Sequence, residues 1–464
     1  RPTSQSHQRD EQQRDHRRKP SACRSGFDVQ DKAREDREVI MLDIRLVREN
    51  PKIIEADLKK RLLKDKIKLL HELIKKDKER RELIQKVEEL KHLRNVLTKE
   101  IAGLKAGKKP AAKKLAEVKK LPEKIKSLDE KLAKLNEECS SALLRLPNLL
   151  HDSVPAGKTE DDNKEISKYG VLPNFSFGPK DHIDLGTALG CIDVEHAAKI
   201  SGARFYFLKN QLAILDLALM RCAVDFLVKR NFSFSIPPYL MRRKPYEGVV
   251  DLNDFGDVLY KVEGEDLYLI ATSEHPLTAQ HMDETLMQLP IKYAGLSTNF
   301  RKEAGAHGKD TKGIFRVHQF NKVEQIIICK PEDSWKSHEE LIKNAEEFLT
   351  LLEIPFRKML MCSAETGSIA AKKYDLEAWL PAQQRYREVV SCSNCTDYQA
   401  RRLNIKYREK EGEAPKGFVH TLNATLVADR VLVAILENNQ QKDGSVLVPK
   451  ALQSYCGFEK IENK

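Results

Sequence analysis

Apolar residues in the first third of the chain recur at alternating steps of three and four residues, the spacing of one helix face. The pattern covers about residues 69–146, and residues 107–110, which contain Gly107 and Pro110, interrupt it. Before the interruption, with one seam position taken by Arg94, it comprises Leu83, Val87, Leu90, Leu97, Ile101 and Leu104. After it, the pattern comprises Leu115, Val118, Ile125, Leu128, Leu132, Leu135 and Cys139. Two apolar seams separated by a Gly/Pro break predict an antiparallel helical hairpin.

Each helix of this hairpin would contain roughly 35–40 residues, or about 50–60 Å at 1.5 Å per residue. A hairpin of this kind has no core beyond its own seam, so we expect it to project from the body of the protein. Pro122 lies inside the second helix and lacks a backbone donor. We therefore expect it to kink or fray that helix.

The remainder of the chain has a different pattern. From about residue 181 to 461, helical stretches are mixed with β-rich runs such as residues 266–272 and 314–329, and the apolar run 426–436 is interpreted as helix core. Strand pairs outnumber strand–helix alternations, so we predict an α+β domain on a mainly antiparallel sheet. The predicted division is 41–150 for an N-terminal domain with the hairpin, 151–180 for a connector and 181–464 for the α+β domain.

Residues 1–40 carry almost no apolar periodicity and are rich in Arg, Gln, Ser and Asp, so we expect them to be disordered. They also contain acidic residues, which argue against a mitochondrial transit peptide. These are Asp10, Glu11, Asp15, Asp28, Asp31, Glu35, Asp36 and Glu38. Because Met41 is the first methionine, we interpret residues 1–40 as an upstream extension.

The charge balance favours a polyanionic partner. The 464 residues carry a formal net charge of +11, with 33% charged and 41% hydrophobic residues. Part of the positive charge falls on the predicted hairpin, at Lys105, Lys108, Lys109, Lys113, Lys114, Lys119 and Lys120. An exposed basic hairpin suits phosphate backbones, whereas the alternative is a solvated helix face with no partner. No apolar run approaches the roughly 18 residues that span a bilayer, so no membrane association is expected.

The nine cysteines are far apart, which is typical of reduced thiols in a cytoplasmic protein. Cys392 and Cys395 form one C-x-x-C pair. A single pair offers only half of the ligands of a structural zinc site, so we expect neither metal binding nor redox activity there.

Residues 300–324 combine groups that can clamp a nucleotide, and the sequence contains neither a G-x-G-x-x-G nor a P-loop pattern. They are interpreted as strand, Gly-rich loop and strand. Residues two apart share a strand face, so Arg301 and Glu303 would point together, as would Phe320 and Glu324. An arginine holds phosphate bidentately, an aromatic ring stacks on a base, and a carboxylate accepts from an exocyclic amine. The alternative is a surface hairpin with an ordinary Arg–Glu pair.

The segment as a whole resembles motif 2 of class II aminoacyl-tRNA synthetases, in the form found in the seryl-tRNA synthetase family, and its sequence is of the archaeal type. It is F-R-K-E-A-G-A-H-G-K-D-T-K-G-I-F-R-V-H-Q-F-N-K-V-E. The resemblance extends over about residues 41–461. It includes Arg94-Asn95, the connector residues Leu146-Pro147-Asn148, His151, Val154, Pro155 and Gly157, the runs 201–206 and 393–402, and the triplet Thr272-Ser273-Glu274. Motif 1 would lie near residues 232–239, with Pro237 or Pro238 as its proline.

The resemblance implies an ATP site and the role of each residue in it. Arg301 would bind the α-phosphate and the serine carboxylate, Glu303 would read the adenine amino group, and Phe320 would stack on the base. Glu388 and Ser391 would hold Mg²⁺ on the phosphates. Arg301, Glu388 and Arg430 are the implied catalytic residues. The implied ATP-binding set is Arg301, Lys302, Glu303, Val317, Phe320, Glu388, Val389, Val390, Ser391 and Arg430.

The resemblance also implies a serine site and a reaction. The implied serine-binding set is Thr272, Ser273, Glu274, Arg301, Glu324, Asn423 and Thr425. Thr272 and Glu274 would hold the ammonium group, and the residues around the hydroxyl would reject alanine, which leaves their polar groups unpaired. The reaction would form seryl-adenylate from L-serine and ATP and transfer serine to the 3′ end of tRNA(Ser), and of tRNA(Sec) where present. A cytoplasmic homodimer is implied, with the hairpin of one subunit reaching tRNA on the other.

One departure concerns motif 3. The gap from Asn423 to Arg430 is seven residues, whereas the family pattern has eight. Inside a helix, the loss of one residue rotates the later residues by ~100° relative to the earlier ones, but a strand-to-helix turn can absorb it. Asp429 places a negative charge beside the expected phosphate site. The alternative to an active ligase is therefore a catalytically impaired paralogue that binds RNA. His318 and His420 are interpreted as structural.

Overall fold

The computed structural model describes residues 43–252, 256–303 and 313–463. The expectations for residues 1–40, and for the Gly-rich loop at 304–312, lie outside the described residues.

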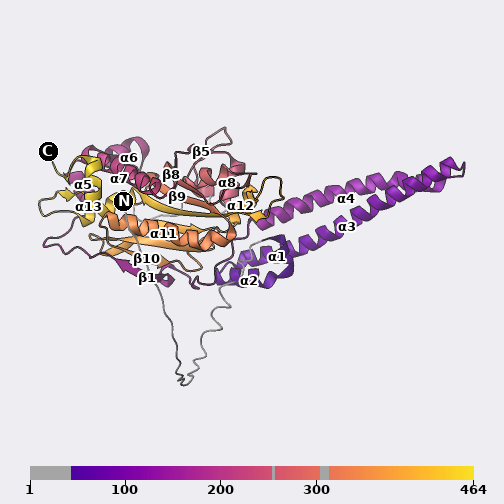
Figure 1. Ribbon diagram of the computed structural model, residues 1–464, viewed down its shortest axis with the longest axis horizontal. Coiled ribbons are helices and arrows are strands. Elements are labelled where there is room, and N and C mark those ends of the chain that lie inside the picture. Colours follow the sequence, from indigo (N-terminus) through magenta and orange to yellow (C-terminus); the bar gives the residue numbers. More distant parts are fainter. Residues whose placement is uncertain (1–42, 253–255, 304–312, 464) are drawn as a thin grey trace, which may run out of the picture. The chain divides into compact units, whose positions relative to one another are not determined.

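The N-terminal part forms the predicted helical hairpin. Two short helices, α1 (Ile44–Glu49) and α2 (Pro51–Lys60), precede the long helices α3 (Lys64–Ala106) and α4 (Ala112–Leu144). Helices α3 and α4 lie side by side along their length (Figure 1). With 43 and 33 residues they are less equal than predicted, because α3 begins before the apolar pattern does.

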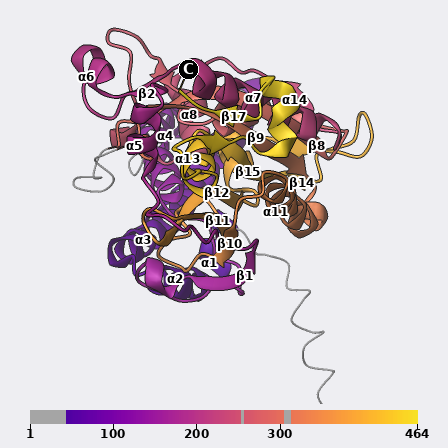
Figure 2. The same cartoon turned by 90° about the vertical axis from the view of Figure 1, so that its left-hand side faces the viewer.

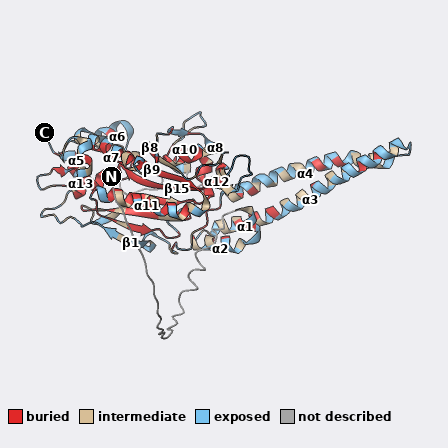
Figure 3. Cartoon of the chain, in the orientation of Figure 1, coloured by how far each residue is buried: buried red, intermediate tan, exposed pale blue. Residues whose placement is uncertain are grey.

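The predicted seam is confirmed as the contact between the two long helices. Leu97 of α3 packs with Leu121 and Ile125 of α4, while the outer faces are exposed (Figure 3). The expected fraying at Pro122 is wrong, because α4 continues through it, and the expected kink stays a prediction. Pro122 is exposed, so water can hydrate the backbone carbonyl that its missing N–H leaves without a partner.

At the base of the hairpin, one buried carboxylate joins α1 to α3. Asp77 is 1% exposed and accepts from Arg48 Nε at 2.7 Å, Arg80 Nη2 at 3.0 Å and Arg81 Nε at 3.1 Å. Burial alone would raise the pKa of Asp77, but these hydrogen bonds outweigh it and lower the pKa to about 2. The carboxylate therefore stays ionised and fixes the orientation of α3 on the short helices.

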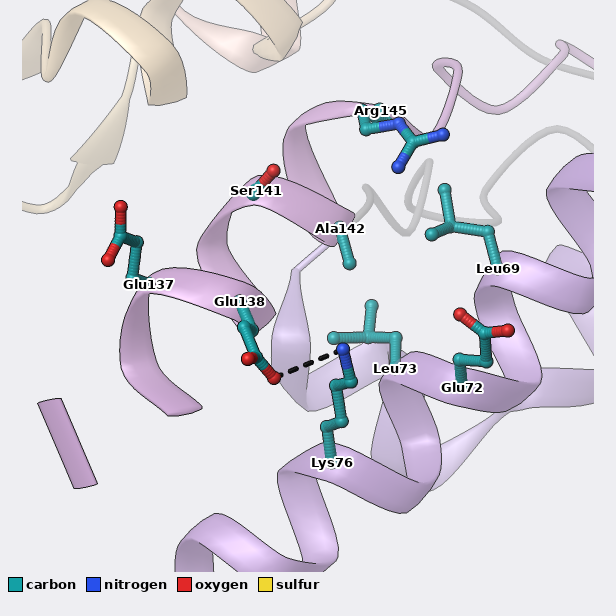
Figure 4. A pocket seen from close by; sticks show the side chains of 9 residues that line it. All are labelled: Leu69, Glu72, Leu73, Lys76, Glu137, Glu138, Ser141, Ala142 and Arg145. Carbon is teal, nitrogen blue, oxygen red and sulfur yellow. Dashed lines mark ion pairs between the residues drawn. The ribbon is translucent and has the colours of Figure 1, made fainter. Parts of the chain in front are cut away.

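A small pocket opens between α3 and α4 next to this carboxylate (Figure 4). It is lined by Leu69, Glu72, Leu73, Lys76, Glu137, Glu138, Ser141, Ala142 and Arg145. An ion pair of 3.1 Å between Lys76 and Glu138 crosses it. The pocket marks where the two helices separate to admit the apolar cluster of α1 and α2, which includes Leu46 and Ile54.

Buried polar groups join the hairpin base to the second part of the chain. Arg61 is 5% exposed and donates to the carbonyl oxygens of Gly367 at 2.5 Å and Asn148 at 2.7 Å. The amide of Asn148 donates to the carbonyl oxygens of Ile369 at 2.9 Å and Cys395 at 2.8 Å. The hairpin therefore rests on residues at the ends of the central strands.

The second part is built on an eight-stranded sheet, confirming the predicted mainly antiparallel α+β architecture (Figure 2). Its order is β1 (Lys164–Tyr169), β10 (Phe356–Leu360), β11 (Lys372–Leu380), β12 (Arg385–Asn394), β15 (His420–Ala428), β9 (Gln319–Cys329), β8 (Ile291–Phe300) and β4 (Ser233–Ser235). All neighbours are antiparallel except β4 and β8. The edge strand β1 comes from the predicted connector.

Helices cover one face of this sheet around the main core. These are α7 (Asn210–Val228), α11 (Ser334–Leu351) and α13 (Arg430–Asn438). They meet the sheet through alternate residues, such as Val323 and Ile327 of β9. The other face carries a smaller core with α8 (Arg243–Val249), α10 (Glu274–Ala279) and α12 (Tyr398–Leu403). The polar region beside this core, over β9, β12 and β15, is called the cleft below.

The remaining elements are short. The helices are α5 (His182–Ala188), α6 (Glu195–Ser201) and α14 (Lys450–Cys456), with 3₁₀ turns η1 (Glu160–Asp162), η2 (Gly256–Val258) and η3 (Pro331–Asp333). The small strands are β2 (Ile192–Asp193), β3 (Phe207–Leu208), β5 (Leu240–Met241), β6 (Tyr268–Leu269), β7 (Thr285–Leu286), β13 (Lys406–Tyr407), β14 (Gly417–Phe418), β16 (Val446–Leu447) and β17 (Lys460–Ile461).

Three boundaries differ from those predicted. The run 266–272 contributes only the two residues of β6, and the run 314–329 becomes a strand only from Gln319. The apolar run 426–436 is not one helix, because residues 426–428 end β15 and α13 begins at Arg430. A strand and a helix buried on all sides have the same apolar appearance, which explains the error. Among the helices of the described ranges, none is long and apolar enough to cross a membrane.

Candidate active site

The cleft face of the sheet gathers polar residues by strand alternation. On β9, Phe320, Lys322 and Glu324 share this face, while Val323 and Ile327 enter the core. Thr425 of β15 is paired with Glu324, and Asn423 lies two residues away on the same face. Both β15 residues are 8% exposed. The structure therefore brings the predicted hydroxyl-binding residues Glu324, Asn423 and Thr425 together.

The predicted triplet Thr272-Ser273-Glu274 surrounds the carboxylate of Glu324. The hydroxyl of Thr272 donates to Glu324 Oε2, as do Ser273 Oγ at 3.3 Å and the backbone N–H of Glu274 at 3.2 Å. Lys322 completes the group, with Nζ 2.8 Å from Glu324 Oε2 and 2.7 Å from Thr272 Oγ1. Glu324 thus keeps one oxygen tied to protein donors, which fixes its side chain at the floor of the cleft.

Glu274 is held at the first residue of α10, beside this group. Gln399 Nε2 donates to Glu274 Oε1 at 2.7 Å, and Gln399 in turn accepts from Thr421 Oγ1 at 2.6 Å. Desolvation, followed by the charge of Glu324, raises the pKa of Glu274 to about 7. The neighbouring carboxylate of Glu324 therefore opposes ionisation of Glu274, whereas Lys322 and Arg301 favour it.

Arg301 reaches the same cleft, although not in the way predicted. Strand β8 ends at Phe300, so Arg301 and Glu303 do not share a strand face, and Glu303 has a left-handed φ of 51°. Arg301 Nε and Nη2 donate to the carbonyl oxygen of Ala271, each at 3.3 Å, and its guanidinium carbon lies 5.1 Å from the ring centre of Phe320. Arg301 and Phe320 are therefore close, as a nucleotide clamp requires.

Glu303 is brought to the site by the turn after the strand. It accepts from Arg316 Nη1 at 2.9 Å, and its side chain is 10% exposed. The neighbouring Lys302 has its ammonium 5.7 Å from the ring centre of Tyr260. Val317 is 6% exposed within the segment that leads into β9. The interpretation of His318 as structural fits its contact, since His318 Nδ1 lies 2.8 Å from the carbonyl oxygen of Arg301.

An irregularity in β12 explains how Glu388 and Ser391 reach one face. Residues three apart point to opposite faces of a regular strand, but the pairing of β11 with β12 shifts here and leaves Val389 as an extra residue. Val389 and Val390 both enter the core, so their side chains do not line the cleft. Glu388 and Ser391 consequently face the cleft together.

The strand next to them adds two residues that sequence reasoning missed. Asp375 of β11 is paired with Ser391 and is 2% exposed, and Lys373 Nζ lies 3.6 Å from its carboxylate. Desolvation raises the pKa of Asp375 to about 7, opposed by Lys373. The alternation of side chains along β11 would have predicted Lys373 and Asp375 as site residues if the pairing of β11 with β12 had been known from the sequence.

Arg430 lies in the cleft despite the shortened gap. It is the first residue of α13; its Nε donates to the carbonyl oxygen of Phe315 at 3.1 Å and its Nη1 lies 3.8 Å from Glu388 Oε1. Desolvation would raise the pKa of Glu388, but the charges of Arg430, Lys373, Arg301 and Arg316 outweigh it and lower the pKa. The concern about Asp429 is corrected, because its carboxylate turns away from the cleft toward Tyr206 and Asn321.

Strand β15 contains another irregularity shortly before Arg430. The pairing of β15 with β9 shifts between Thr425 and Val427, which leaves Leu426 unpaired. Leu426 and Val427 both enter the core. Because α13 begins only at Arg430, the seven-residue gap from Asn423 to Arg430 lies in the strand and its turn, and the rotation expected inside a helix does not apply.

The C-x-x-C pair does not act as one unit. Cys392 belongs to the core and its thiol lies 3.8 Å from the carbonyl oxygen of His338, whereas Asn423 Nδ2 lies 3.7 Å from Cys395 Sγ on the cleft side. Burial raises the pKa of both thiols. His420 is buried too, and desolvation lowers its pKa to about 4, so it stays neutral.

Comparison with known proteins gives the same assignment. The seryl-tRNA synthetase N-terminal domain family matches residues 41–150, and the tRNA synthetase class II core domain (G, H, P, S and T) matches residues 260–439. The serine–tRNA ligase of Methanocella arvoryzae is 49% identical over 418 residues, covering 89% of this chain and 98% of that protein.

Solved structures agree. The crystal structure of seryl-tRNA synthetase from Pyrococcus horikoshii complexed with ATP has a TM-score of 0.88 at 46% identity, covering 91% of this chain and 99% of that one. The cytoplasmic serine–tRNA ligase of Naegleria fowleri, in complex with AMP, has a TM-score of 0.82 at 39% identity, covering 92% and 99%. The chain therefore belongs to the seryl-tRNA synthetase family of class II aminoacyl-tRNA synthetases, the serine–tRNA ligases.

Proposed function

We propose that the cleft over β9, β12 and β15 carries out both steps of serine–tRNA ligation, with a distinct role for each of the residues that line it. The observation that carries the proposal is the convergence of three guanidinium groups with two carboxylates. Arg430 Nη1 lies 3.8 Å from Glu388 Oε1, the charges of Arg301 and Arg316 also stabilise the Glu388 carboxylate, and the charge of Arg301 stabilises that of Glu274. A cluster of this kind suits a polyanion at one end and an amino acid at the other.

In the serine site, Glu274 and the hydroxyl of Thr272 hold the ammonium group, and Arg301 holds the carboxylate. The tied carboxylate of Glu324 accepts the serine hydroxyl, with Asn423 and Thr425 opposite it on β15. Ser273 donates a hydrogen bond to Glu324 and so helps to hold its carboxylate in place. Because these polar groups are buried, alanine would leave them unpaired, and sites built in this way discriminate by roughly 10⁴–10⁵-fold.

In the ATP site, Phe320 stacks on the adenine and Glu303 accepts from its amino group. The 2.9 Å hydrogen bond from Arg316 supports this role, because it orients the carboxylate of Glu303. Lys302 and the backbone of Val317 border the nucleotide. Arg301 contacts the α-phosphate and Arg430 the terminal phosphates. ATP as substrate agrees with the relatives solved with ATP and with AMP.

A magnesium ion fits the oxygen atoms of β12. Glu388 and Ser391 share a face, and Asp375 Oδ1 beside Ser391 is a buried oxygen that no donor of the described residues contacts. No group of three or more His, Cys, Asp or Glu side chains in these residues could hold a metal alone, so phosphate oxygens would complete the shell. When bound, Mg²⁺ would neutralise charge on the phosphates. Val389 and Val390 contribute through their backbone.

The chemistry then needs no nucleophilic side chain. The serine carboxylate oxygen attacks the α-phosphorus of ATP, forming seryl-adenylate as pyrophosphate leaves. A terminal ribose hydroxyl of tRNA next attacks the carbonyl carbon of the adenylate, forming an ester as AMP leaves. Arg301, Glu388 and Arg430 act by positioning the reactants and balancing the charge that develops.

The tRNA partner meets the helical hairpin. Its lysines Lys105, Lys108, Lys109, Lys113, Lys119 and Lys120 are exposed, which supports contact with an RNA backbone. The substrates are tRNA(Ser) and, where present, tRNA(Sec).

A homodimer is supported by apolar side chains that the single chain leaves exposed next to the edge strand β4. Leu217 of α7 is 70% exposed, Phe234 of β4 is 44% exposed and Ile236 is 61% exposed. Free thiols at the described cysteines support a reducing, cytoplasmic location. The domain division is 41–150, 151–180 and 181–464, with the middle segment supplying β1 to the sheet.

Serine-dependent exchange between pyrophosphate and ATP tests the proposal. The purified full chain should incorporate labelled pyrophosphate into ATP only with L-serine, and should charge tRNA(Ser). The alternative, an impaired paralogue that binds RNA, predicts tRNA binding without exchange. The position of Arg430 beside Glu388 favours the active enzyme. A folded dimer that shows no exchange would refute it.

A further inference from the structure

Asp429 lies immediately before Arg430, yet its carboxylate does not serve the helix that begins there. An aspartate at this position usually caps the first turn through its side chain, but Asp429 makes no such bond in the described residues. It is 2% exposed, and its Oδ2 accepts from the backbone N–H of Asn321 at 2.9 Å and from the hydroxyl of Tyr206 at 2.6 Å. The side chain therefore joins the motif 3 turn to strand β9 and to the residue before β3.

The contact between Asp429 and Asn321 is reciprocal. The backbone N–H of Asp429 donates to the carbonyl oxygen of Asn321 at 3.2 Å, while the N–H of Asn321 donates to the Asp429 carboxylate. Two hydrogen bonds in opposite directions fix both the distance and the orientation of the two segments. We call these two hydrogen bonds the clamp between Asp429 and Asn321. Because Phe320 precedes Asn321 and Arg430 follows Asp429, the clamp fixes the backbone next to Phe320 and next to Arg430.

A second buried acid completes the arrangement. Asp216 of α7 is 5% exposed and accepts from Asn321 Nδ2 at 3.3 Å. Asp216 Oδ1 and Asp429 Oδ1 receive no hydrogen bond from a donor group of the described residues, although the two carboxyl groups are within hydrogen-bonding reach of each other. Two adjacent buried carboxylates cannot both remain ionised at low cost. Burial raises the pKa of both carboxyl groups, most strongly that of Asp429, so the arrangement favours one proton shared between Asp429 and Asp216.

We propose that the clamp between Asp429 and Asn321, closed by Asp216 and Tyr206, is a positioning device for ATP. It holds Arg430 toward the phosphates and Phe320 toward the base. One buried group therefore positions the residues that contact the two ends of the nucleotide. The inference rests on the proposed roles of Arg430 and Phe320. It also gives a physical reason why a motif 3 that is one residue shorter keeps its arginine in the cleft: the turn is tied from the side by Asp429.

A pair of substitutions at one position tests the device. Asp429→Ala removes the clamp and should raise the KM for ATP in the exchange reaction by about tenfold or more, with the KM for serine changed less than about twofold. Asp429→Asn retains an oxygen for Asn321 and Tyr206 and an N–H for Asp216, and should stay within about threefold of wild type for both. Asp443→Ala is the matched control, since this aspartate is exposed and contacts Ser445 and Lys460 outside the cleft.

Three results would overturn the inference. The first is an Asp429→Ala variant with an unchanged KM for ATP. The second is an equal rise in both KM values, which indicates general disruption. The third is an Asp429→Asn variant as impaired as the alanine variant, which contradicts a carboxyl group that carries a proton.

A second variant covers the case in which Asp429→Ala does not fold. Tyr206→Phe removes one donor of the clamp without leaving a cavity and should raise the KM for ATP by about twofold to fivefold. No change in that KM would overturn the inference. If the wild-type chain shows no exchange, the proposed function fails, while the clamp is still tested by ATP binding. The rise in Tm that ATP produces should be smaller in Tyr206→Phe than in Asp443→Ala, and equal rises would count against the clamp.

Discussion

The ammonium group of Lys322 lies 2.8 Å from the carboxylate of Glu324, and both side chains are buried, at 5% and 2% exposure. They are two residues apart on β9 and therefore point to the same side of the sheet. Lys322 also reaches Thr272, so a single cation joins the carboxylate at the floor of the serine site to the hydroxyl that borders it. The ion pair makes the floor rigid before any substrate arrives.

Lys322→Met should destabilise the protein and weaken serine binding. The substitution leaves Glu324 buried beside Glu274 without a compensating charge, and breaking a buried pair costs about 3–5 kcal/mol. Chemical denaturation should show a lower free energy of unfolding, and exchange should show a higher KM for serine. Lys343→Met is the matched control, because the side chain of Lys343 is 73% exposed. Equal stability of the two variants would contradict this account of the floor.

Serine binding should strengthen as pH rises through about 7. The pKa of Glu274 is raised to about 7 in the empty site, so below this pH the carboxyl group is mostly protonated. A bound serine ammonium favours the ionised form, and binding therefore releases a proton. From pH 8 to pH 6 the affinity should fall roughly tenfold, since each pH unit below the pKa costs about one factor of ten.

Calorimetric titration of serine in buffers of different ionisation enthalpy measures this effect. The wild type should release close to one proton per serine at pH 6 and almost none at pH 8. Glu274→Gln, which cannot ionise, should release none at either pH. Proton release that persists in Glu274→Gln would assign the titration to another group.

Arg301→Ala should abolish exchange while leaving tRNA binding nearly intact. The guanidinium group contacts the reacting phosphate and carboxylate in the proposed site, and the hairpin that meets tRNA lies elsewhere in the chain. Arg385→Ala provides an arginine control at the exposed start of β12. Exchange and filter-binding assays distinguish the two functions. Retained exchange in Arg301→Ala would show that the phosphate assignment is wrong.

Shortening the hairpin should preserve exchange and remove tRNA charging. Removing residues 86–130 and joining the ends with a short Gly linker keeps the base, including Asp77 and the apolar cluster around it. The 3.2 Å contact of Arg80 with Asn136 indicates that the cut ends face each other. The KM for serine and ATP in exchange should be unchanged.

A milder variant separates charge from length. Replacing Lys108, Lys109 and Lys113 by alanine retains the helices and should weaken tRNA binding and its dependence on salt concentration. Charging that survives in the shortened chain would mean that the hairpin does not bind tRNA.

The helical hairpin illustrates what can be predicted from local pattern. Its seam depends on the repeat of apolar residues such as Leu97 and Ile125, and its break depends on Gly107 and Pro110. Each of these residues influences the backbone only within a few positions along the chain. The strands β9 and β15 were less predictable at their ends, because fully buried strands and helices have the same apolar composition. The resemblance in residues 300–324 identified the family correctly, which the comparisons confirmed.

By itself, the sequence determined the fold class, the hairpin, the family and the side-chain types that the site needs. Only the tertiary structure decided how those side chains meet. An extra residue at Val389 turns Glu388 and Ser391 to one face, the shortened gap of motif 3 falls in a strand and turn rather than in a helix, and Asp429 turns inward to Asn321 rather than outward to phosphate. The physical reason is that strand pairing, between neighbours in a hairpin for Val389 and between segments far apart in the sequence for Asp429, sets which way each of these side chains points, and no pattern within a single strand carries that information.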